Sequence, residues 1–290
     1  LLDRSFQTVI PEDPYALTPS EQHVVDRLKV AFLNSEKLQL HARFLFATGS
    51  IYKTFNGNLL YHGCIPMDDD GSFKSLYQNH TASAGKDLMD AFTRRVRQSF
   101  TTDDPAKKQQ GLDAMWYLWC GPCSPLFGKE KMATFEHYFI EDQATHKEPR
   151  NIYYSLRDDE ATVRKILQTF DLNPEKGRII NGHVPVIVKK KESPLKAGGK
   201  LIVIDGGFCP AYQKKTGIAG YTLVYNSWGL LLATHQSQAE SDTENPEPHD
   251  IDCTTEFLES SNQRIRIEQT DQGREILCGI EEIKALHEAY

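Results

Sequence analysis

The chain has 290 residues, of which 39% are hydrophobic and 25% charged, so it resembles ordinary globular proteins and has ample core for one large domain or two small ones. Its formal net charge of -7 argues against nucleic acid as the main partner. No apolar run reaches the ~18 residues of a membrane span, and no signal-peptide pattern opens the chain, so a membrane partner is not predicted.

The first helix signal lies near the amino terminus. Thr18-Pro19-Ser20-Glu21 combines a capping box with proline at the first helical position, and helical spacing of apolar residues extends the predicted helix to about residue 40. Further helices are predicted at about 86–100, 112–119, 129–139, 159–171 and from 280 onward. The helix at 112–119 is expected to bury Leu112, Met115, Trp116 and Trp119.

Strands are predicted from short runs bounded by turn residues. They cover about 50–55, 59–62, 184–188, 201–204, 220–225, 230–234 and 264–268. The Asn56-Gly57 pair is typical of a tight turn between the first two. Acidic and polar residues with almost no large apolar side chain follow residue 235, which predicts a mobile linker over 236–262.

Two histidines stand at the ends of predicted strands. His62 occurs in a Tyr-His-Gly frame, and His183 sits where an Asn-Gly turn meets a strand. Rigid strand ends beside glycine are typical binding positions, and neutral imidazole is a ligand for zinc, manganese and iron. The simpler interpretation is that each histidine caps a turn or satisfies a buried carbonyl. Two imidazoles cannot complete a metal site alone.

Two further side chains could add to a metal site. Asp205 follows a predicted strand and could supply a carboxylate, although aspartate before Gly-Gly is commonly a turn residue. His235, at the end of the last predicted hairpin strand, is a weaker candidate of the same kind.

A lysine-rich segment surrounds the second histidine motif. Seven lysines (189, 190, 191, 196, 200, 214 and 215) lie between residues 189 and 215, against two acids, Glu192 and Asp205. This local field favours an anionic ligand such as phosphate, whereas the simpler interpretation is a solvated lysine-rich loop. A non-catalytic module that binds phosphorylated ligands or a partner chain would use the same lysines, without any need for metal.

A third signal is Trp119-Cys120-Gly121-Pro122-Cys123, which matches the thioredoxin-type redox motif. A thiol-disulfide oxidoreductase using Cys120 and Cys123 is therefore an alternative. That chemistry needs a helix that starts at the first cysteine, but the preceding residues are predicted to be helical instead. The six cysteines are irregularly spaced, which favours reduced thiols in a cytoplasm over a disulfide framework.

Four motifs occur in a specific order along the chain: His62-Gly63-Cys64-Ile65-Pro66, Asn181-Gly182-His183-Val184-Pro185, Asp205-Gly206-Gly207-Phe208 and Thr216-Gly217-Ile218-Ala219-Gly220. Together they resemble the carboxy-terminal part of class III, Firmicutes-type fructose-1,6-bisphosphatases, which are calcineurin-like metallophosphoesterases. The resemblance runs from near Pro11 to the final helix. It implies an α/β (α+β) fold, namely the C-terminal half of a calcineurin-like αββα sandwich with a mixed sheet and flanking helices.

The resemblance assigns His62 and His183 to the metals, and it also reveals an absence. Calcineurin-like enzymes carry Asp-x-His, Gly-Asp-x-x-Asp and Gly-Asn-His motifs that supply the other ligands and a catalytic histidine, and none of them occurs here. We therefore expect a C-terminal fragment whose dinuclear Mn²⁺ or Mg²⁺ site is completed by residues outside this chain. Catalytic residues stay unassigned, and the chain alone is expected to bind metal weakly and hydrolyse little.

The resemblance implies a cytoplasmic enzyme of gluconeogenesis that hydrolyses the 1-phosphate of fructose 1,6-bisphosphate. Lys196, Lys200 and Tyr212 are the candidate substrate- or phosphate-binding residues. The expected partners are the sugar bisphosphate and the N-terminal half of the same enzyme, and a homo-oligomer is left open. Residues 1–235 would form the C-terminal half of the catalytic domain, with a helical insertion at about 80–175, and residues 263–290 would add a strand and a helix.

Overall fold

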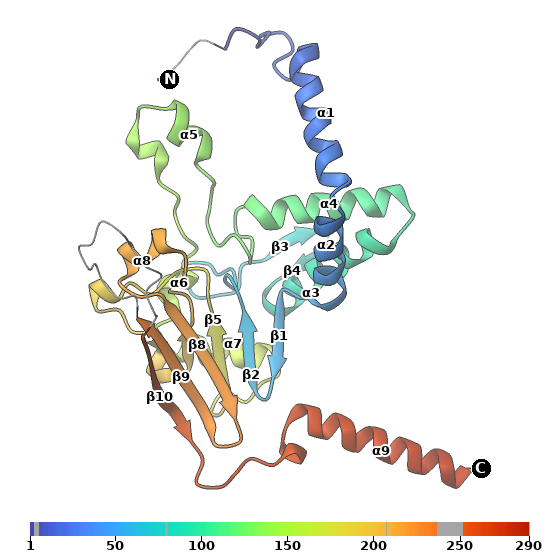
Figure 1. The fold of residues 1–290 in the computed structure, drawn as a ribbon, viewed down its shortest axis with the longest axis vertical. Coiled ribbons are helices and arrows are strands. Elements are labelled where there is room, and N and C mark those ends of the chain that lie inside the picture. Colours follow the sequence, from blue (N-terminus) through green and yellow to red (C-terminus); the bar gives the residue numbers. More distant parts are fainter. Residues whose placement is uncertain (3–5, 79–80, 207, 237–251, 290) are drawn as a thin grey trace. The chain divides into compact units, whose positions relative to one another are not determined.

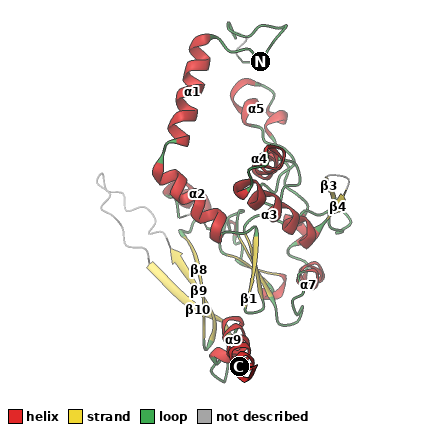
Figure 2. Cartoon of the chain, turned by 90° about the vertical axis from the view of Figure 1, so that its right-hand side faces the viewer, coloured by secondary structure: helices red, strands yellow, loops and turns green. Residues whose placement is uncertain are grey.

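The computed structural model describes residues 1–2, 6–78, 81–206, 208–236 and 252–289 (Figures 1 and 2). The chain divides into two units. The first contains Leu1–Ile51 and Met89–Asn151, and the second contains Tyr52–Leu88 and Ile152–Tyr290. The middle segment is thus grouped with the amino-terminal helices, and the domain bounds at 1–235, 236–262 and 263–290 stay a prediction.

The first unit is helical. Its helices are α1 (Pro19–Leu33), α2 (Glu36–Thr48), most of α3 (Gly85–Thr101), α4 (Pro105–Cys120), α5 (Thr134–Phe139) and the short η1 (Gln143–His146). The capping box at Thr18 and Glu21 is present. The helix predicted to reach residue 40 is instead two helices, because the Ser35 side chain accepts a hydrogen bond from the backbone amide of Leu38 and starts α2 afresh.

Helix α4 buries a different face from the one that its large apolar residues predict. Its buried residues are Gly111, Ala114 and Leu118, whereas Leu112, Met115, Trp116 and Trp119 are exposed. The reason is close packing on α3: a Cβ added to Gly111 would lie 1.9 Å from the Cβ of Ser99. Small residues let the two backbones approach, so they define the contact in place of the large ones.

The second unit contains the main sheet. Among the described residues, β1 (Tyr52–Phe55), β2 (Asn58–Tyr61), β5 (Arg178–Asn181), β7 (Leu201–Val203) and β6 (Leu195–Lys196) form a five-stranded sheet in that order. Strands β2, β5 and β7 are mutually parallel, and the two edge strands run antiparallel to their neighbours. A small ribbon of β3 (Leu76–Gln78) and β4 (Thr81–Ser83) is separate.

Strand β5 lies earlier in the chain than the strand predicted at 184–188. The extended run ends at Asn181, and His183 has a positive φ of 66°, which turns the chain out of the sheet. Val184–Val188 then runs without strand pairing into the 3₁₀ helix η2 (Val188–Lys190), and Pro185 has no amide to donate. The strands predicted at 50–55, 59–62 and 201–204 are confirmed within a few residues.

The core of the second unit lies between the main sheet and a helix. Leu59, Ile179 and Leu201 are fully buried on the three parallel strands. Helix α7 (Glu160–Thr169) buries Val163, Ile166 and Leu167, with Asp159 as its N-cap, as the periodicity at 159–171 predicts. The short α6 (Tyr153–Leu156) and η3 (Ala197–Gly199) complete the connections around the sheet.

A second, antiparallel sheet contains β8 (Gly220–Asn226), β9 (Gly229–Gln236) and β10 (Asp252–Ser260), in the order β10-β9-β8. In Figures 1 and 2 the two sheets form separate layers, with α7 on the far side of the main sheet. The mixed α/β class with flanking helices is therefore confirmed. The mobile linker predicted over 236–262 lies outside the described residues at 237–251, and Asp252–Ser260 pairs with β9 instead.

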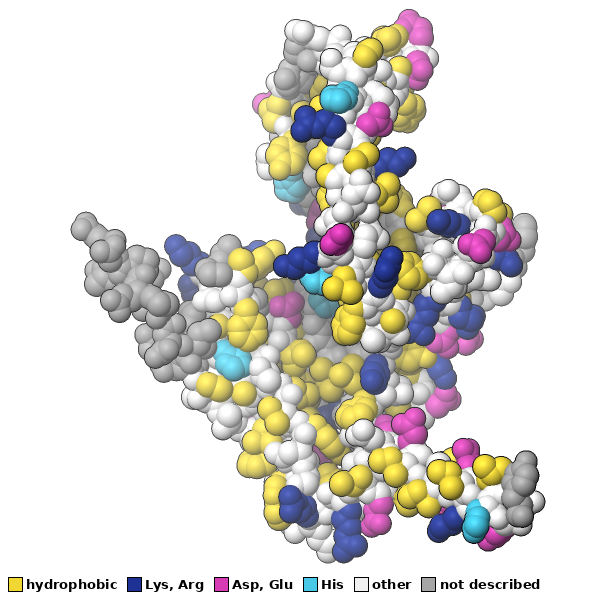
Figure 3. All heavy atoms as spheres, turned by 45° about the vertical axis from the view of Figure 1, so that its right-hand side comes forward, with side chains coloured by type: hydrophobic (Ala, Val, Ile, Leu, Met, Phe, Trp, Pro, Cys, Tyr) yellow, Lys and Arg dark blue, Asp and Glu magenta, His cyan; other side chains and the backbone are white. Residues whose placement is uncertain are grey.

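The carboxyl terminus is helical. After η4 (Ile267–Gln269), which occupies the place of the strand predicted at 264–268, helix α9 covers Asp271–Ala289. The helix exposes Ile276, Ile280 and Ile283 along one side, and Figure 3 shows hydrophobic side chains at its surface. The remaining helix of this unit is α8 (Pro210–Thr216). Within the ranges that the structure describes, no helix is both long and apolar enough to cross a bilayer.

Candidate functional site

The two predicted metal-binding histidines lie at one edge of the main sheet. His62 directly follows β2, and His183 follows β5 by two residues, with Tyr61 opposite Asn181 in the parallel register. Because carboxyl ends of parallel strands meet at the same edge, neighbouring strands deliver both imidazoles to one place. His62 is exposed and His183 is half-buried, so the pair faces solvent.

The imidazoles of His62 and His183 contact each other directly. Nδ1 of His183 lies 3.2 Å from Nε2 of His62, and the rings meet edge to face with centroids 5.1 Å apart. Two nitrogens that bind one metal at ~2.0–2.1 Å with angles between 90° and 109° are separated by about 2.8–3.4 Å. The observed separation is that of a hydrogen bond between the two rings, and it also lies within the range for two ligands of a single ion. If these two nitrogens held one ion, the ring protons would remain on Nδ1 of His62 and Nε2 of His183.

The His62 ring packs on the backbone of Gly182. A Cβ added to Gly182 would lie 3.4 Å from Nδ1 of His62, which is an ordinary van der Waals contact. His183 itself has left-handed backbone angles, which are costly for a residue with a Cβ. Strain of this kind persists where the surrounding structure holds it, and it is concentrated at functional sites.

Asn181 connects the two strand ends. Its Nδ2 donates to the carbonyl oxygens of Tyr61, His62 and Gly63 at 3.2, 3.1 and 2.8 Å. This orientation turns the Oδ1 atom toward Arg157, whose Nη1 lies 3.4 Å away. Because Asn181 is fully buried, these bonds fix the path of the chain that carries His62.

An aromatic and cationic group lies next to the pair. The Tyr154 ring stacks near His183, with centroids 6.4 Å apart, and the Arg157 guanidinium carbon lies 5.3 Å from the centre of the Tyr154 ring. Sequence reasoning missed Tyr154 and Arg157, because no local pattern separates them from other residues of an amphipathic segment. The burial of Arg157 and of the Tyr154 hydroxyl oxygen beside the strand ends identifies them.

The described residues do not complete a metal site. No group of three or more His, Cys, Asp or Glu side chains in the described ranges could hold an ion. Asp205 follows β7 at the same edge, and its backbone carbonyl accepts a hydrogen bond from Val186, but its carboxylate does not join such a group. His235 lies on β9 of the other sheet, where its Nε2 contacts the Thr222 hydroxyl. The histidine pair therefore offers two ligands.

The predicted phosphate-binding residues are dispersed in the second unit. Lys196 lies on β6 and forms an ion pair with Asp158 at 3.3 Å. Lys200 directly precedes β7, so it lies at the amino end of that strand, whereas the histidine pair lies at the edge that contains the carboxyl ends. The Lys200 ammonium donates a hydrogen bond to the Glu175 carbonyl. Tyr212 is exposed on α8. Their roles in binding substrate stay predictions.

The Cys120–Cys123 motif does not have the geometry of a redox motif. Cys120 is the last residue of α4, so it sits at the carboxyl end of a helix, whose dipole disfavours a thiolate. Cys123 is buried, with Sγ 3.7 Å from a carboxylate oxygen of Glu130. This position is the opposite of the helix start that oxidoreductases use.

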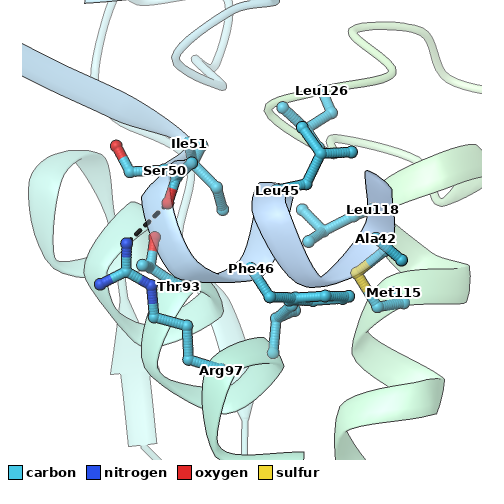
Figure 4. Close-up of a pocket in the computed structure, with 12 residues that line it drawn as sticks. Ala42, Leu45, Phe46, Ser50, Ile51, Thr93, Arg97, Met115, Leu118 and Leu126 are labelled. Atoms are coloured by element: carbon cyan, nitrogen blue, oxygen red, sulfur yellow. Dashed lines mark hydrogen bonds between the residues drawn. The ribbon is translucent and has the colours of Figure 1, made fainter. Parts of the chain in front are cut away.

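An apolar pocket lies in the first unit. It has a volume of about 390 Å³ and is lined by α2, α3 and α4, with Leu45, Phe46 and Met115 among its walls (Figure 4). Arg97 is its charged member, and its guanidinium donates to the Gly49 carbonyl at 2.6 Å. The lining includes no His, Cys, Asp or Glu that could bind a metal, so this pocket is not the candidate site.

The fold and the strand-end histidines define an α/β protein with a polar site at the carboxyl edge of parallel strands, the usual position for catalytic and ligand groups in such sheets. The family model described as Firmicute fructose-1,6-bisphosphatase matches residues 1–290. The chain belongs to this family.

Named relatives support the same family. A protein of Clostridium botulinum (strain Kyoto / Type A2), named fructose-1,6-bisphosphatase class 3, is 49% identical over 291 residues, which cover 100% of this chain and 44% of that protein. A protein of the same name from Clostridium tetani (strain Massachusetts / E88) shows the same identity and coverage. The chain thus spans less than half the length of these relatives. No solved structure matches it.

Proposed function

We propose that this chain forms part of a metal-dependent phosphatase that hydrolyses the 1-phosphate of fructose 1,6-bisphosphate, with His62 and His183 as ligands of one shared divalent ion. The family membership supports the reaction class, since the relatives carry that activity in their names. The observation that carries the site is the 3.2 Å separation of Nδ1 of His183 and Nε2 of His62.

The chemistry follows from what these side chains can do. A bound divalent ion lowers the pKa of its water ligand and stabilises charge on phosphoryl oxygens. Asn181 holds the chain at His62, and the two imidazoles already contact each other, so the two proposed ligand nitrogens are close together before an ion arrives. This preorganisation reduces the free energy needed to assemble the site.

Further ligands must come from outside the described side chains. Hard ions such as Mn²⁺ and Mg²⁺ favour carboxylate oxygens, and two imidazoles supply neither the coordination number nor the charge that a dinuclear centre needs. We propose that the additional length found in the relatives supplies these groups, and that the complete site is a manganese or magnesium centre of the metallophosphoesterase type. Lys196, Lys200 and Tyr212 remain the proposed attraction for the sugar bisphosphate, and the proposed location is the cytoplasm.

The test is a manganese-dependent phosphate-release assay on fructose 1,6-bisphosphate, with the complete natural protein that carries this sequence. We expect His62→Ala and His183→Ala each to reduce kcat roughly 100-fold or more and to lower the bound metal content. His235→Ala is the matched control. Because His235 lies on the other sheet, this variant should retain activity. Full activity and full metal content in both strand-end variants, with unchanged thermal stability, would disprove the proposal.

The competing proposal is a non-catalytic module that binds phosphorylated ligands through the lysines. Such a module would bind inorganic phosphate equally well with and without manganese and would release no phosphate from the substrate.

A further inference from the structure

Arg157 is a buried cation beside the histidine pair. It follows α6, is 7% exposed, and its guanidinium lies against the face of Tyr154. An arginine stays charged in proteins and presents five N–H donors in a fixed fork. Burying such a group is unfavourable unless an anion and hydrogen-bond acceptors replace its water.

The described part of the protein leaves this guanidinium undersatisfied. Its Nη1 makes one long hydrogen bond to Oδ1 of Asn181, and its Nε is buried with no hydrogen-bond partner among the described residues. The acidic side chains next to Arg157 in the sequence bind other partners. Asp158 pairs with Lys196, and Asp159 accepts hydrogen bonds from Thr162 at the start of α7. No carboxylate in the described ranges forms an ion pair with Arg157.

The position of Arg157 indicates which anion it serves. Asn181, which accepts from Arg157, also donates to the His62 carbonyl, and Tyr154, which covers the guanidinium, stacks beside His183. Arg157 thus contacts Asn181, which holds the backbone at His62, and Tyr154, whose ring stacks beside the His183 ring. Planar guanidinium groups bind phosphate through two parallel hydrogen bonds, which few other side chains can do.

We propose that Arg157 binds a phosphate group of the sugar bisphosphate beside the histidine pair, with Asn181 and Tyr154 holding the guanidinium in position. This inference rests on the proposed function, since it names a substrate-binding residue for the same site. It also accounts for the undersatisfied donors, because a phosphate supplies both the missing charge and the missing acceptors.

The experiment compares Arg157→Met and Arg157→Lys in the complete natural protein, with Arg164→Met as the matched control. Arg164 is an arginine of the same unit that pairs with Glu160 and Glu175 on the protein surface. The first readout is the dissociation constant of inorganic phosphate, measured by calorimetry in the presence of a metal chelator. We expect Arg157→Met to weaken phosphate binding about 10- to 100-fold, Arg157→Lys to weaken it less, and the control to stay within about 2-fold.

The second readout separates binding from folding. We expect Arg157→Met to raise the KM for fructose 1,6-bisphosphate more than it lowers kcat, and to abolish the rise in thermal stability that phosphate gives the unmodified protein. If Arg157→Met does not fold, phosphate binding by Arg157→Lys tests the inference, because lysine keeps the positive charge but loses the two parallel N–H donors of the guanidinium. An unchanged phosphate affinity in a folded Arg157 variant would overturn the inference and would indicate neutralisation by a carboxylate of the protein.

Failure of the proposed function would look different. Because phosphate binding is measured without metal or turnover, it does not depend on the roles of His62 and His183. Loss of phosphate affinity in Arg157→Met together with full activity in the histidine variants would support Arg157 as an anion-binding residue and would overturn the metal-ligand proposal alone.

Discussion

The hydroxyl oxygens of Tyr61 and Tyr153 lie 2.7 Å apart inside the protein, one donating a hydrogen bond to the other. Tyr61 ends β2, immediately before His62, and Tyr153 begins α6, four residues before Arg157. Both side chains are buried. This contact therefore ties the strand end that carries one imidazole to the helix that precedes the buried arginine.

We expect a double-mutant cycle on this pair to show strong coupling. Tyr61→Phe removes one partner of a buried hydrogen bond and should reduce the free energy of unfolding by about 1–3 kcal/mol, and Tyr153→Phe should do likewise. The double variant should lose clearly less than the sum, since both polar atoms are then gone. Urea denaturation measures all three values. Additive losses would show that the two hydroxyls act independently.

The same pair predicts alkaline sensitivity. Burial raises the pKa of Tyr61 well above the usual value, and burial also raises the pKa of Tyr153. The folded state therefore holds these protons more tightly than the unfolded state, whose tyrosines ionise near pH 10. The stabilisation is complete below that pH and is lost as the pH rises through it, by about 1.4 kcal/mol per pH unit for each tyrosine.

Denaturation midpoints measured between pH 8 and 11.5 would test this dependence. The Tyr61→Phe/Tyr153→Phe variant should show a shallower alkaline decline than the unmodified protein. Tyr15→Phe, which changes a tyrosine that is 91% exposed, should leave the decline unchanged. An identical slope in all three proteins would contradict the assignment.

The left-handed backbone of His183 predicts an unequal response to two substitutions. His183→Ala and His183→Gly both remove the imidazole, but only glycine adopts a φ of 66° without steric cost. We expect the glycine variant to be more stable than the alanine variant by roughly 1 kcal/mol, while both lose metal binding. Thermal unfolding of the two metal-free variants makes the comparison, and equal stabilities would argue that the surroundings have relaxed the strain.

Asn181 is expected to matter for both stability and activity. Asn181→Ala removes the donor that three carbonyl groups share, and it should cost about 1–3 kcal/mol of unfolding free energy. The chain at His62 should then lose its fixed path, so kcat should fall even under conditions where the variant is folded. Asn34→Ala, at an exposed helix end, is the control. A stable and fully active Asn181→Ala protein would remove this residue from the site.

Some features of this protein could be predicted from local sequence alone. The capping box at Thr18, the helix at 159–171 and the placement of His62 at a strand end depend on short-range hydrogen bonds and periodicity, so they were predicted correctly. The family resemblance rested on several short motifs in order and is confirmed by the comparisons. His62 and His183 were expected to act together, and the structure brings their rings into contact.

Other features depended on partners distant in the sequence, which local patterns do not contain. The strand predicted at 184–188 is replaced by β5 at Arg178–Asn181, because pairing with β2 and β7 selects the paired segment. Arg157 contacts Asn181, 24 positions away in the sequence. Tyr61 contacts Tyr153, 92 positions away. Sequence thus determined the family and the candidate ligands, whereas the tertiary structure decided which charges are buried, because burial is a property of packing between distant segments.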